Sequence, residues 1–223
     1  MDHYYSRNGI TLYHADCATI LPNVSADLLL TDPPYGIKAS RNFAGGQRFN
    51  NYSGLLKGKP VVQARDYGSL SWDDMPCSAE LLDLMRSRCK YQIIFGGNYF
   101  VLPPSRCWLV WDKLKGEVSY ADCELAWTNL DRVVKRIQHK YNGFIQQAGH
   151  KEQRYHPTQK PVRVMEWCIS QAPVLVQSVL DPMCGVGSSL LAAYKLGKSA
   201  IGVEAHEPYC EVTAKRLDDL FKG

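Results

Sequence analysis

The stretch Asp-Pro-Met-Cys-Gly-Val-Gly-Ser-Ser at residues 181–189 decides the fold of this chain. It follows an apolar run at 176–180 that predicts a strand and leads into a predicted helix at 188–196; a second predicted strand, 199–203, ends at Glu204. A glycine turn in this position lets the backbone approach a ligand, and an acidic residue after the next strand can bind a ribose. Leu190 stands where a dinucleotide phosphate loop has its third glycine, which favours an adenosine ligand without a diphosphate. A tight strand–helix turn followed by a surface glutamate would give the same pattern.

Outward from this turn, strand-like and helix-like patterns alternate along the chain. Strands are predicted at 26–31, 91–95, 108–111, 125–128 and, although it is strongly charged, 132–138; helices are predicted at 78–88, 160–171 and 207–221. Such alternation predicts an α/β fold, with a mixed, mostly parallel sheet covered by helices on both faces. The 223 residues correspond to a single domain, with a long, basic and mobile loop at about 36–76.

The composition excludes several classes of protein. With 45% hydrophobic and 22% charged residues, the chain is neither disordered nor a coiled coil. Its apolar runs are too short to cross a membrane and its N-terminus has no signal-peptide pattern, so we expect a cytoplasmic protein. The eight cysteines are expected to be reduced thiols, and because no pair has Cys-x-x-Cys spacing, no metal site is predicted.

Basic residues gather in two windows of an otherwise acidic chain. The window 38–65 has six basic residues and no acidic one; the window 131–154 has six basic residues against Asp131 and Glu152; the remaining chain carries 14 basic and 20 acidic residues. Either window alone fits a solvated surface, but together they indicate a polyanionic partner. The candidate contacts are Lys38, Arg41, Arg48, Lys57 and Lys59 in the first window, and Arg132, Lys135 and Arg136 in the second.

Asp-Pro-Pro-Tyr at residues 32–35 follows the predicted strand 26–31 directly. An open α/β sheet binds its ligands at this end of the strands. The two prolines fix their own φ angles and leave a rigid edge that presents carbonyl acceptors. Asp32 adds an acceptor and Tyr35 adds a flat face, a combination that suits a planar base with an exocyclic amino group. By itself the tetrapeptide would also fit an Asx-Pro turn.

Three motifs in this order resemble those of the amino-group DNA methyltransferases, which use S-adenosylmethionine. They are Asp-Pro-Pro-Tyr at 32–35, His-Pro-Thr-Gln-Lys-Pro at 156–161 and Asp-Pro-Met-Cys-Gly-Val-Gly at 181–187. The tetrapeptide comes before the cofactor loop in the sequence, and this motif order is similar to the circularly permuted β order of that family. The resemblance extends from His14 to Glu204 and implies a Rossmann-like, S-adenosylmethionine-dependent methyltransferase fold.

The resemblance also implies roles for individual residues. Asp32 and the carbonyl of Pro33 would hold the target amino group, Pro34 would shape the rim, and Tyr35 would stack on the base. Glu204 would bind the cofactor ribose. The residues that the resemblance assigns to the cofactor are Asp16 and Cys17 near its adenine, Asp181, Gly185 and Gly187 around its methionine end, and also Asp32, Pro182, Cys184 and Ser188. A loop with His156, Pro157, Thr158 and Lys160 would close over the methionine, with Lys160 or Thr158 meeting its carboxylate.

The chain departs from the family pattern in a few places. Met183 stands where the family often has phenylalanine, and Ser188-Ser189 replaces a common threonine pair. The segment of about 129–155, where this class carries its target-recognition region, is very short. None of the cysteines is needed as a nucleophile, because transfer from a sulfonium to an amino group can be direct; Cys184 is interpreted as a small packing residue.

Aspartate at the start of the tetrapeptide is similar to the adenine-specific members of the family, which implies adenine N6 in duplex DNA as the target atom. Because this atom is inaccessible in a stacked duplex, the base is expected to be flipped out. Methylation of cytosine N4 or of adenine in RNA is the alternative within the class. A non-catalytic nucleic-acid-binding module is the alternative from another class, and a nicotinamide oxidoreductase would leave Asp-Pro-Pro-Tyr unexplained. By resemblance we further expect a prokaryotic or phage protein that acts as a homodimer, with a cognate restriction enzyme.

Overall fold

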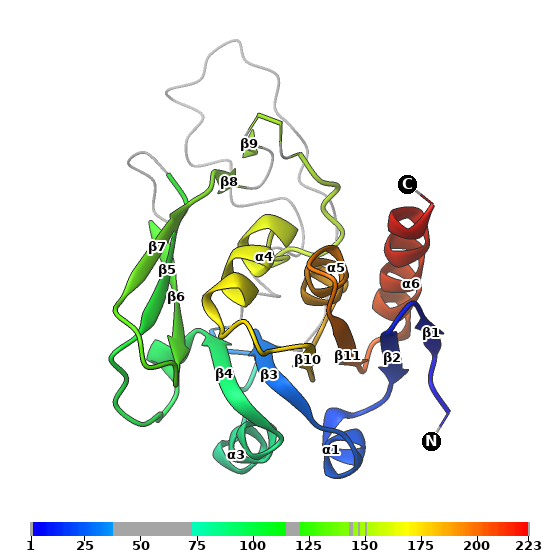
Figure 1. The fold of residues 1–223 in the computed structure, drawn as a ribbon, viewed down its shortest axis with the longest axis horizontal. Coiled ribbons are helices and arrows are strands. Elements are labelled where there is room, and N and C mark those ends of the chain that lie inside the picture. The colour runs from blue at the N-terminus through cyan, green and yellow to red at the C-terminus, as the bar shows by residue number, and fades with distance from the viewer. Residues whose placement is uncertain are drawn as a thin grey trace.

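The structure is a computed structural model that describes residues 2–37, 73–114, 121–142, 145–146, 148–149 and 151–222. The described residues form a nine-stranded sheet, seen nearly edge-on in Figure 1. In sheet order the strands are β1 (Tyr5–Arg7), β2 (Ile10–His14), β11 (Ser199–Glu204), β10 (Ser178–Asp181), β3 (Ala26–Thr31), β4 (Cys89–Phe95), β6 (Cys123–Thr128), β5 (Trp108–Asp112) and β7 (Lys135–Gln138).

The centre of the sheet is parallel and its two sides are mixed. Strands β2, β11, β10, β3 and β4 pair in parallel, whereas β1 is antiparallel to β2 and β6 is antiparallel to both of its neighbours. The chain continues from β10 to β11 on one side and from β3 towards β4 on the other. Open α/β sheets bind their ligands at such a change of direction, which here lies at the carboxyl ends of β10 and β3. Asp181 ends β10, and Asp32 directly follows β3.

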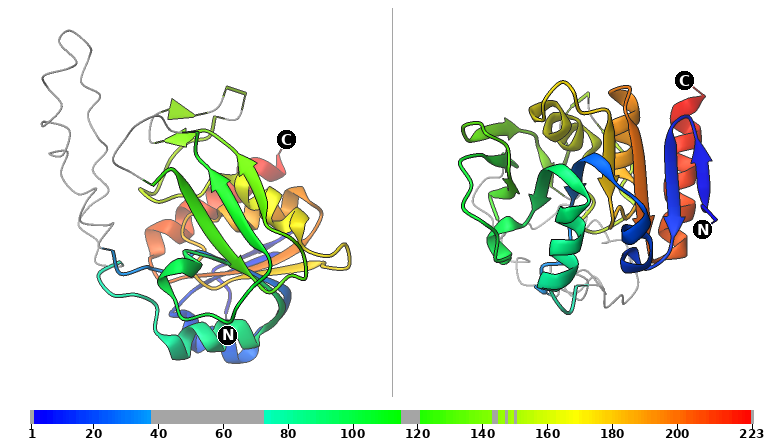
Figure 2. Two further views of the ribbon diagram at one scale, coloured as in Figure 1. Left: turned by 90° about the vertical axis from the view of Figure 1, so that its left-hand side faces the viewer. Right: turned by 60° about the horizontal axis from the view of Figure 1, so that its bottom comes forward.

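Helices cover both faces of the sheet, as Figures 1 and 2 show. One face carries α1 (Cys17–Ile20) and α3 (Ala79–Ser87), and the other carries α4 (Val162–Gln171), α5 (Ser188–Lys195) and α6 (Glu207–Phe221). Short 3-10 turns, η1 (Leu21–Asn23) and η3 (Gly97–Tyr99), follow α1 and β4, and a small hairpin joins β8 (Tyr141–Asn142) to β9 (Ile145–Gln146). The prediction of an α/β fold with a mostly parallel sheet is therefore confirmed.

The alternation of side chains along the central strands explains this arrangement. Leu28 and Leu30 of β3 pack into the core beneath α4 and α5, whereas Leu29 packs into the core beneath α1 and α3. Ile93 and Ile94 of β4 divide between the two cores in the same way. A strand that is apolar on both faces requires cover on both faces, which accounts for the continuous apolar run in the sequence.

The structure adds elements that the sequence pattern does not predict. Strands β1 and β2 and helix α1 come from the first 23 residues, for which no element was predicted. The strand predicted in the charged segment 132–138, by contrast, is present as β7, which begins at Lys135. Most of the loop expected at 36–76, including all five candidate contacts of the first basic window, lies outside the described residues.

The sequence predicts no disulfide bond, no metal site and no membrane-spanning segment. All eight cysteines lie in the described residues and are free thiols. The described part of the chain has no cluster of three or more potential metal ligands and no helix of the length and apolarity that would cross a membrane.

Candidate active site

The Asp-Pro-Pro-Tyr turn directly follows β3, and hydrogen bonds to residues 73 and 77, which follow the long loop in the sequence, hold its backbone. The backbone amides of Tyr35 and Gly36 donate to Asp73 Oδ1 at 2.8 and 2.9 Å, and Asp73 is buried. The amide of Cys77 donates to the carbonyl of Pro34 at 3.0 Å. Two amides on one carboxylate oxygen fix the backbone of the turn, while the Asp32 side chain is held by the Tyr35 hydroxyl and the Lys160 ammonium.

The Tyr35 ring lies among aromatic residues and close to a glycine. It stacks on Tyr99, with ring centroids 4.8 Å apart and an interplanar angle of 12°, and meets the edge of Phe100. Gly96 has φ of +66°, and any side chain there would collide with the Tyr35 ring. The Tyr35 hydroxyl donates to Asp32 Oδ1, and burial together with Asp32 raises the pKa of that hydroxyl well above its ordinary value. Tyr35 is therefore a fixed, neutral ring beside the carboxylate.

Lys160 makes its contacts with two carboxylates. Its ammonium group pairs with Asp32 Oδ2 and lies 3.0 Å from Glu124 Oε2. Burial lowers the pKa of Lys160, but the two carboxylates outweigh this effect and raise the pKa above its ordinary value. Burial in turn raises the pKa of Asp32, with Lys160 opposing it. The predicted contact of Lys160 with the cofactor carboxylate stays a prediction, and in this structure the lysine holds the Asp-Pro-Pro-Tyr carboxylate.

The glycine turn at 181–187 is held by the strands on either side of it. Ser189 donates to Asp181 Oδ2, and burial raises the pKa of Asp181 to about 6. The amide of Cys184 donates to the carbonyl of Val203 at 3.0 Å. Burial raises the pKa of the Cys184 thiol well above its ordinary value, so the thiol remains protonated and fits its interpretation as a packing residue.

Glu204 links this turn to the end of the neighbouring strand. Its Oε2 accepts from the amide of Gly185 at 2.9 Å, and its Oε1 accepts from the amide of His206 at 2.8 Å. Its backbone carbonyl accepts from the amide of Ala15 at 3.1 Å, which brings Asp16 to the same edge of the sheet. Asp16 is exposed and caps α1 by accepting from the amide of Ala18 at 2.9 Å. Cys17, by contrast, is buried in the core.

The residues at this edge fit an adenosine-type cofactor. A carboxylate oxygen has two lone pairs, so both oxygens of Glu204 can still accept a hydroxyl hydrogen besides their backbone amides. Gly185 has φ of +53° and open space where a Cβ would lie, whereas most neighbouring residues are buried. Glu204, Asp16 and the open face of Gly185 form one edge, with His206 and Tyr209 of the α6 start nearby.

The His-Pro-Thr-Gln-Lys-Pro loop lies over the start of α6. The His156 ring meets the edge of Tyr209 at a centroid distance of 4.9 Å, and the amide of Thr158 donates to His156 Nδ1 at 3.2 Å. Burial, with help from Lys160 and Arg154, lowers the pKa of His156 to about 3. A neutral imidazole with a fixed acceptor shapes the loop and carries no charge at neutral pH.

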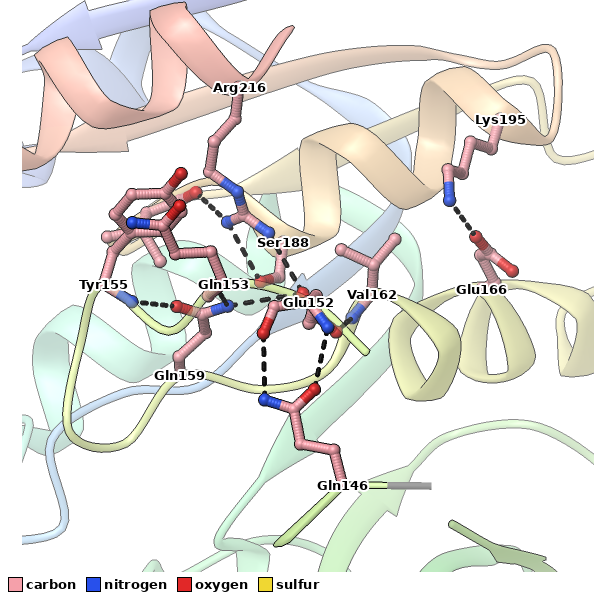
Figure 3. A network of polar contacts seen from close by, with 11 residues as sticks. Gln146, Glu152, Gln153, Tyr155, Gln159, Val162, Glu166, Ser188, Lys195 and Arg216 are labelled. Carbon is pink, nitrogen blue, oxygen red and sulfur yellow. Dashed lines mark hydrogen bonds and ion pairs between the residues drawn. The ribbon is translucent and has the colours of Figure 1, made fainter. Parts of the chain in front are cut away.

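A buried network holds this loop to the rest of the domain (Figure 3). Glu152 accepts from Arg216 of α6 at 3.1 Å, from Gln159 at 3.3 Å and from the amide of Val162 at the start of α4 at 2.9 Å. Arg216 also donates to the carbonyl of Val186 in the glycine turn. The network therefore joins the 152–162 segment to the cofactor loop, a role that the sequence did not predict for Glu152.

The second basic window is described in part. Arg132, Lys135 and Arg136 are exposed on and before the edge strand β7. Arg132 donates to the carbonyl of Gln171 at 2.7 Å, and Arg136 lies 3.6 Å from a carboxylate oxygen of Asp112. Their contact with a polyanion stays a prediction.

The fold and the site together define a Rossmann-like methyltransferase, whose candidate site residues lie at the carboxyl ends of the neighbouring strands β10 and β3. Residues 102–216 match the DNA methylase family of N6/N4 methyltransferases, and the chain belongs to this family. S-adenosylmethionine is the cofactor of the family.

Relatives and solved structures agree with this assignment. The chain is 30% identical over 84 residues to the Type II methyltransferase M2.LlaDCHI of Lactococcus lactis subsp. cremoris, a match covering 38% of this chain and 31% of that protein. It is 25% identical to M.ScaI of Streptomyces caespitosus, with 96% of this chain and 83% of that protein covered. The M1.HpyAVI–SAM complex has the same fold, with a TM-score of 0.57, 21% identity and coverage of 93% and 99%. So does PvuII DNA methyltransferase (cytosine-N4-specific), with a TM-score of 0.55, 15% identity and coverage of 96% and 90%.

Gly185 and Gly187 provide a matched pair of substitutions. Gly187→Ala should lower the free energy of unfolding by about 2–4 kcal/mol, because φ is +79° and the new Cβ would lie 2.5 Å from Thr213 Cγ2. Gly185→Ala should cost only about 1–2 kcal/mol of backbone strain, but should weaken S-adenosylmethionine binding at least about tenfold. Urea unfolding and calorimetric titration measure the two effects. Equal stability losses, or unchanged cofactor binding in Gly185→Ala, would contradict this description of the turn.

Proposed function

We propose that the protein is a DNA methyltransferase that transfers a methyl group from S-adenosylmethionine to the N6 amino group of adenine in duplex DNA. The observation that supports this best is the position of the Asp32 carboxylate. It follows β3 at the ligand edge of the sheet, beside the glycine turn after β10. An acceptor for an amino group and a cradle for a methyl donor thereby lie on neighbouring strands.

The residues around the glycine turn would bind the cofactor. Bound S-adenosylmethionine supplies a methyl group on a sulfonium, a good leaving centre for in-line displacement. Glu204 would accept hydrogen bonds from the ribose hydroxyls, Asp16 would contact the adenine, and the open space beside Gly185 would leave room for the methionine chain. The further contacts carried over from the family are Cys17, Asp32, His156, Pro157, Thr158, Lys160, Asp181, Pro182, Cys184, Gly187 and Ser188.

The Asp-Pro-Pro-Tyr turn would bind the target base. The exocyclic amino group donates to Asp32 and to the carbonyl of Pro33, which stabilises the positive charge that develops on its nitrogen. The base stacks on Tyr35, and Pro34 forms the rim. Because Tyr99 covers one face of Tyr35 and is half exposed, a base that uses this face displaces Tyr99 outward. The target atom is inaccessible in a stacked duplex, so the base is flipped out.

Adenine is favoured over cytosine because the tetrapeptide begins with aspartate, by resemblance to the adenine enzymes. Cytosine N4 is the second candidate, since the family includes both specificities and the fold matches PvuII methyltransferase (cytosine-N4-specific). Methylation of adenine in RNA, or a binding module without activity, are the remaining alternatives.

The basic windows would grip the nucleic acid. Lys38, Arg41, Arg48, Lys57 and Lys59 belong to the segment between β3 and α3 in the sequence, whereas Arg132, Lys135 and Arg136 lie on and before the edge strand β7. The Type II methyltransferases among the relatives come from bacteria. We therefore propose a cytoplasmic protein of a restriction–modification system, with a cognate restriction enzyme and a homodimer as its assembly.

The test is label transfer from radioactive S-adenosylmethionine to unmethylated duplex DNA, single-stranded DNA and RNA of the same sequence. We expect incorporation into duplex DNA at a rate well above that for RNA. Preferential labelling of RNA would show that RNA, and not DNA, is the substrate. Binding of DNA without transfer to any nucleic acid would show a nucleic-acid-binding module without activity.

A salt-dependence measurement tests the second basic window. The double variant Lys135→Ala/Arg136→Ala should bind duplex DNA more weakly and lower the slope of log K against log salt by roughly 0.9 for each lost phosphate contact. Lys222→Ala is the control, because Lys222 is exposed at the end of α6 and pairs with Asp219 at 3.2 Å. An unchanged slope in the double variant would remove these residues from the DNA interface.

A further inference from the structure

Four charged side chains form a chain of ion pairs that begins at the Asp32 carboxylate. Lys160 pairs with Asp32 and lies 3.0 Å from Glu124 Oε2, and Lys113 pairs with Glu124 Oε1. The Lys160 side chain is only 5% exposed, and the side chains of Lys113, Asp32 and Glu124 are 13%, 21% and 22% exposed. The four charges, called here the charge chain, sum to zero.

Each member comes from a different part of the fold. Asp32 follows β3, Lys160 precedes α4, Lys113 follows β5, and Glu124 lies near the start of β6. Because β6 runs antiparallel to its neighbours, its first residues lie at the edge where β4 and β5 end, and Glu124 pairs in register with Trp111. The reversed strand thus brings a carboxylate to the catalytic edge of the sheet.

Stability alone gives little reason for these charges. A largely buried ion pair costs desolvation that its own attraction often fails to offset, so apolar residues of similar volume would serve a core equally well. The attraction is strong here because each group contacts the next one in the chain. Burial raises the pKa of Glu124, but Lys160 and Lys113 outweigh it and lower this pKa to about 2. Glu124 is therefore ionised at neutral pH.

The chemistry at Asp32 explains what a second carboxylate does. During methyl transfer the attacking amino nitrogen acquires positive charge, which a carboxylate stabilises and a nearby ammonium destabilises. Lys160 orients Asp32 but places an ammonium next to the reacting nitrogen. Glu124 contacts the same ammonium and offsets its charge.

Resting on the proposed function, we propose that Glu124 is a positioning residue for methyl transfer, which holds Lys160 against Asp32 and balances its charge at the reacting centre. Glu124 touches neither the base nor the methyl donor in this proposal. Its effect therefore passes through Lys160 and falls on the chemical step.

The test compares Glu124→Gln with Glu166→Gln in single-turnover methyl transfer to duplex DNA. Glu166 of α4 is a matched control, because its side chain is 17% exposed and its carboxylate lies 3.3 Å from Lys195 Nζ (Figure 3). It is not a member of the charge chain. Glu124→Gln should slow the single-turnover rate about tenfold to a hundredfold, with the KM for S-adenosylmethionine little changed. Glu124→Asp should restore part of the rate, and Glu166→Gln should match the wild type.

The pH profile separates this role from a merely structural one. The charged or titratable groups that act on Asp32 are Lys160, Glu124, Tyr35 and, across the crevice, Asp181. The rate requires ionised Asp32 and falls on the acid side as Asp32 is protonated. Glu124→Gln removes a negative neighbour, which lowers the pKa of Asp32 and should move the acid limb to lower pH while the plateau rate falls.

Lys113→Met is a second variant, which should shift the pKa of Asp32 in the direction opposite to that of Glu124→Gln. It removes a positive charge from the far end of the charge chain, so the pKa of Asp32 should rise and the acid limb should move to higher pH. If Glu124→Gln does not fold, this shift decides the question.

The proposal is overturned if Glu124→Gln behaves like Glu166→Gln, or if neither Glu124→Gln nor Lys113→Met moves the acid limb. A wild-type protein that transfers no methyl group to any nucleic acid would contradict the proposed function instead.

Discussion

Replacing Asp32 by alanine should lower the single-turnover rate of methyl transfer at least about a thousandfold. The side chain supplies the acceptor for the target amino group, and Glu124 is not free to replace it, because Lys160 and Lys113 engage its carboxylate. The fold should persist, since Lys160 keeps Glu124 as a partner. Binding of S-adenosylmethionine should weaken much less, by at most about tenfold, because Asp32 is only one of the proposed cofactor contacts and Glu204 and the glycine turn are untouched.

The Asp32 experiment needs a variant that preserves shape and a control of like chemistry. Asp32→Asn keeps the volume but replaces one acceptor oxygen by an amide donor, so it should be as inactive as Asp32→Ala. Asp218→Asn of α6 is the control; Asp218 pairs with Arg7 at 3.0 Å on the surface, remote from β3 in the sheet order. More than a tenth of the wild-type rate in Asp32→Ala would remove Asp32 from the chemical step.

Replacing Arg216 by methionine should lower the free energy of unfolding by about 3–5 kcal/mol, because it strands the largely buried carboxylate of Glu152. The Arg216 side chain is 8% exposed and also donates to the carbonyl of Val186. Glu152→Gln should be destabilising as well, since it strands the arginine. Urea unfolding at neutral pH measures both losses.

A double-mutant cycle shows whether the pair acts as a unit. The double variant Arg216→Met/Glu152→Gln should lose less stability than the sum of the two single losses. Each single variant leaves one buried charge without its partner, whereas the double variant removes both charges. Arg163→Met is the control, since Arg163 is 56% exposed, lies 3.6 Å from Glu166 and should cost less than about 1 kcal/mol. Losses that add without coupling would show that Glu152 and Arg216 do not depend on each other.

The sequence predicts the parts of the fold whose cause is local. The apolar runs that become β3 and β4 are buried on both faces, and the glycine turn at 185–187 follows a strand and opens a helix. The same local signals place Asp32, Asp181 and Glu204 at one edge of the sheet. Strand β1 escapes prediction because it is a short, largely exposed edge strand. Strand β2 alternates, with Ile10 and Leu12 buried, and this pattern is a signal from which the strand could have been predicted.

The residues that support the site depend on contacts between distant segments. Asp73 holds Tyr35 across the long loop, Glu152 holds Arg216 from the other end of the chain, and Glu124 meets Lys160 only because β6 is reversed. The single available signal is a charged residue within an otherwise apolar strand, as in Cys-Glu-Leu-Ala-Trp-Thr at 123–128. Such a residue indicates that a partner exists but does not identify it.

The most direct test of the central claim is nucleoside mass spectrometry of unmethylated duplex DNA after incubation with the wild-type protein and S-adenosylmethionine. The account predicts adenine methylated at N6, and none in a parallel reaction with Asp32→Ala. Cytosine methylated at N4 would keep the site and its mechanism but contradict the assignment of the base. Unmodified DNA, from a folded protein that binds the cofactor, would contradict the account as a whole.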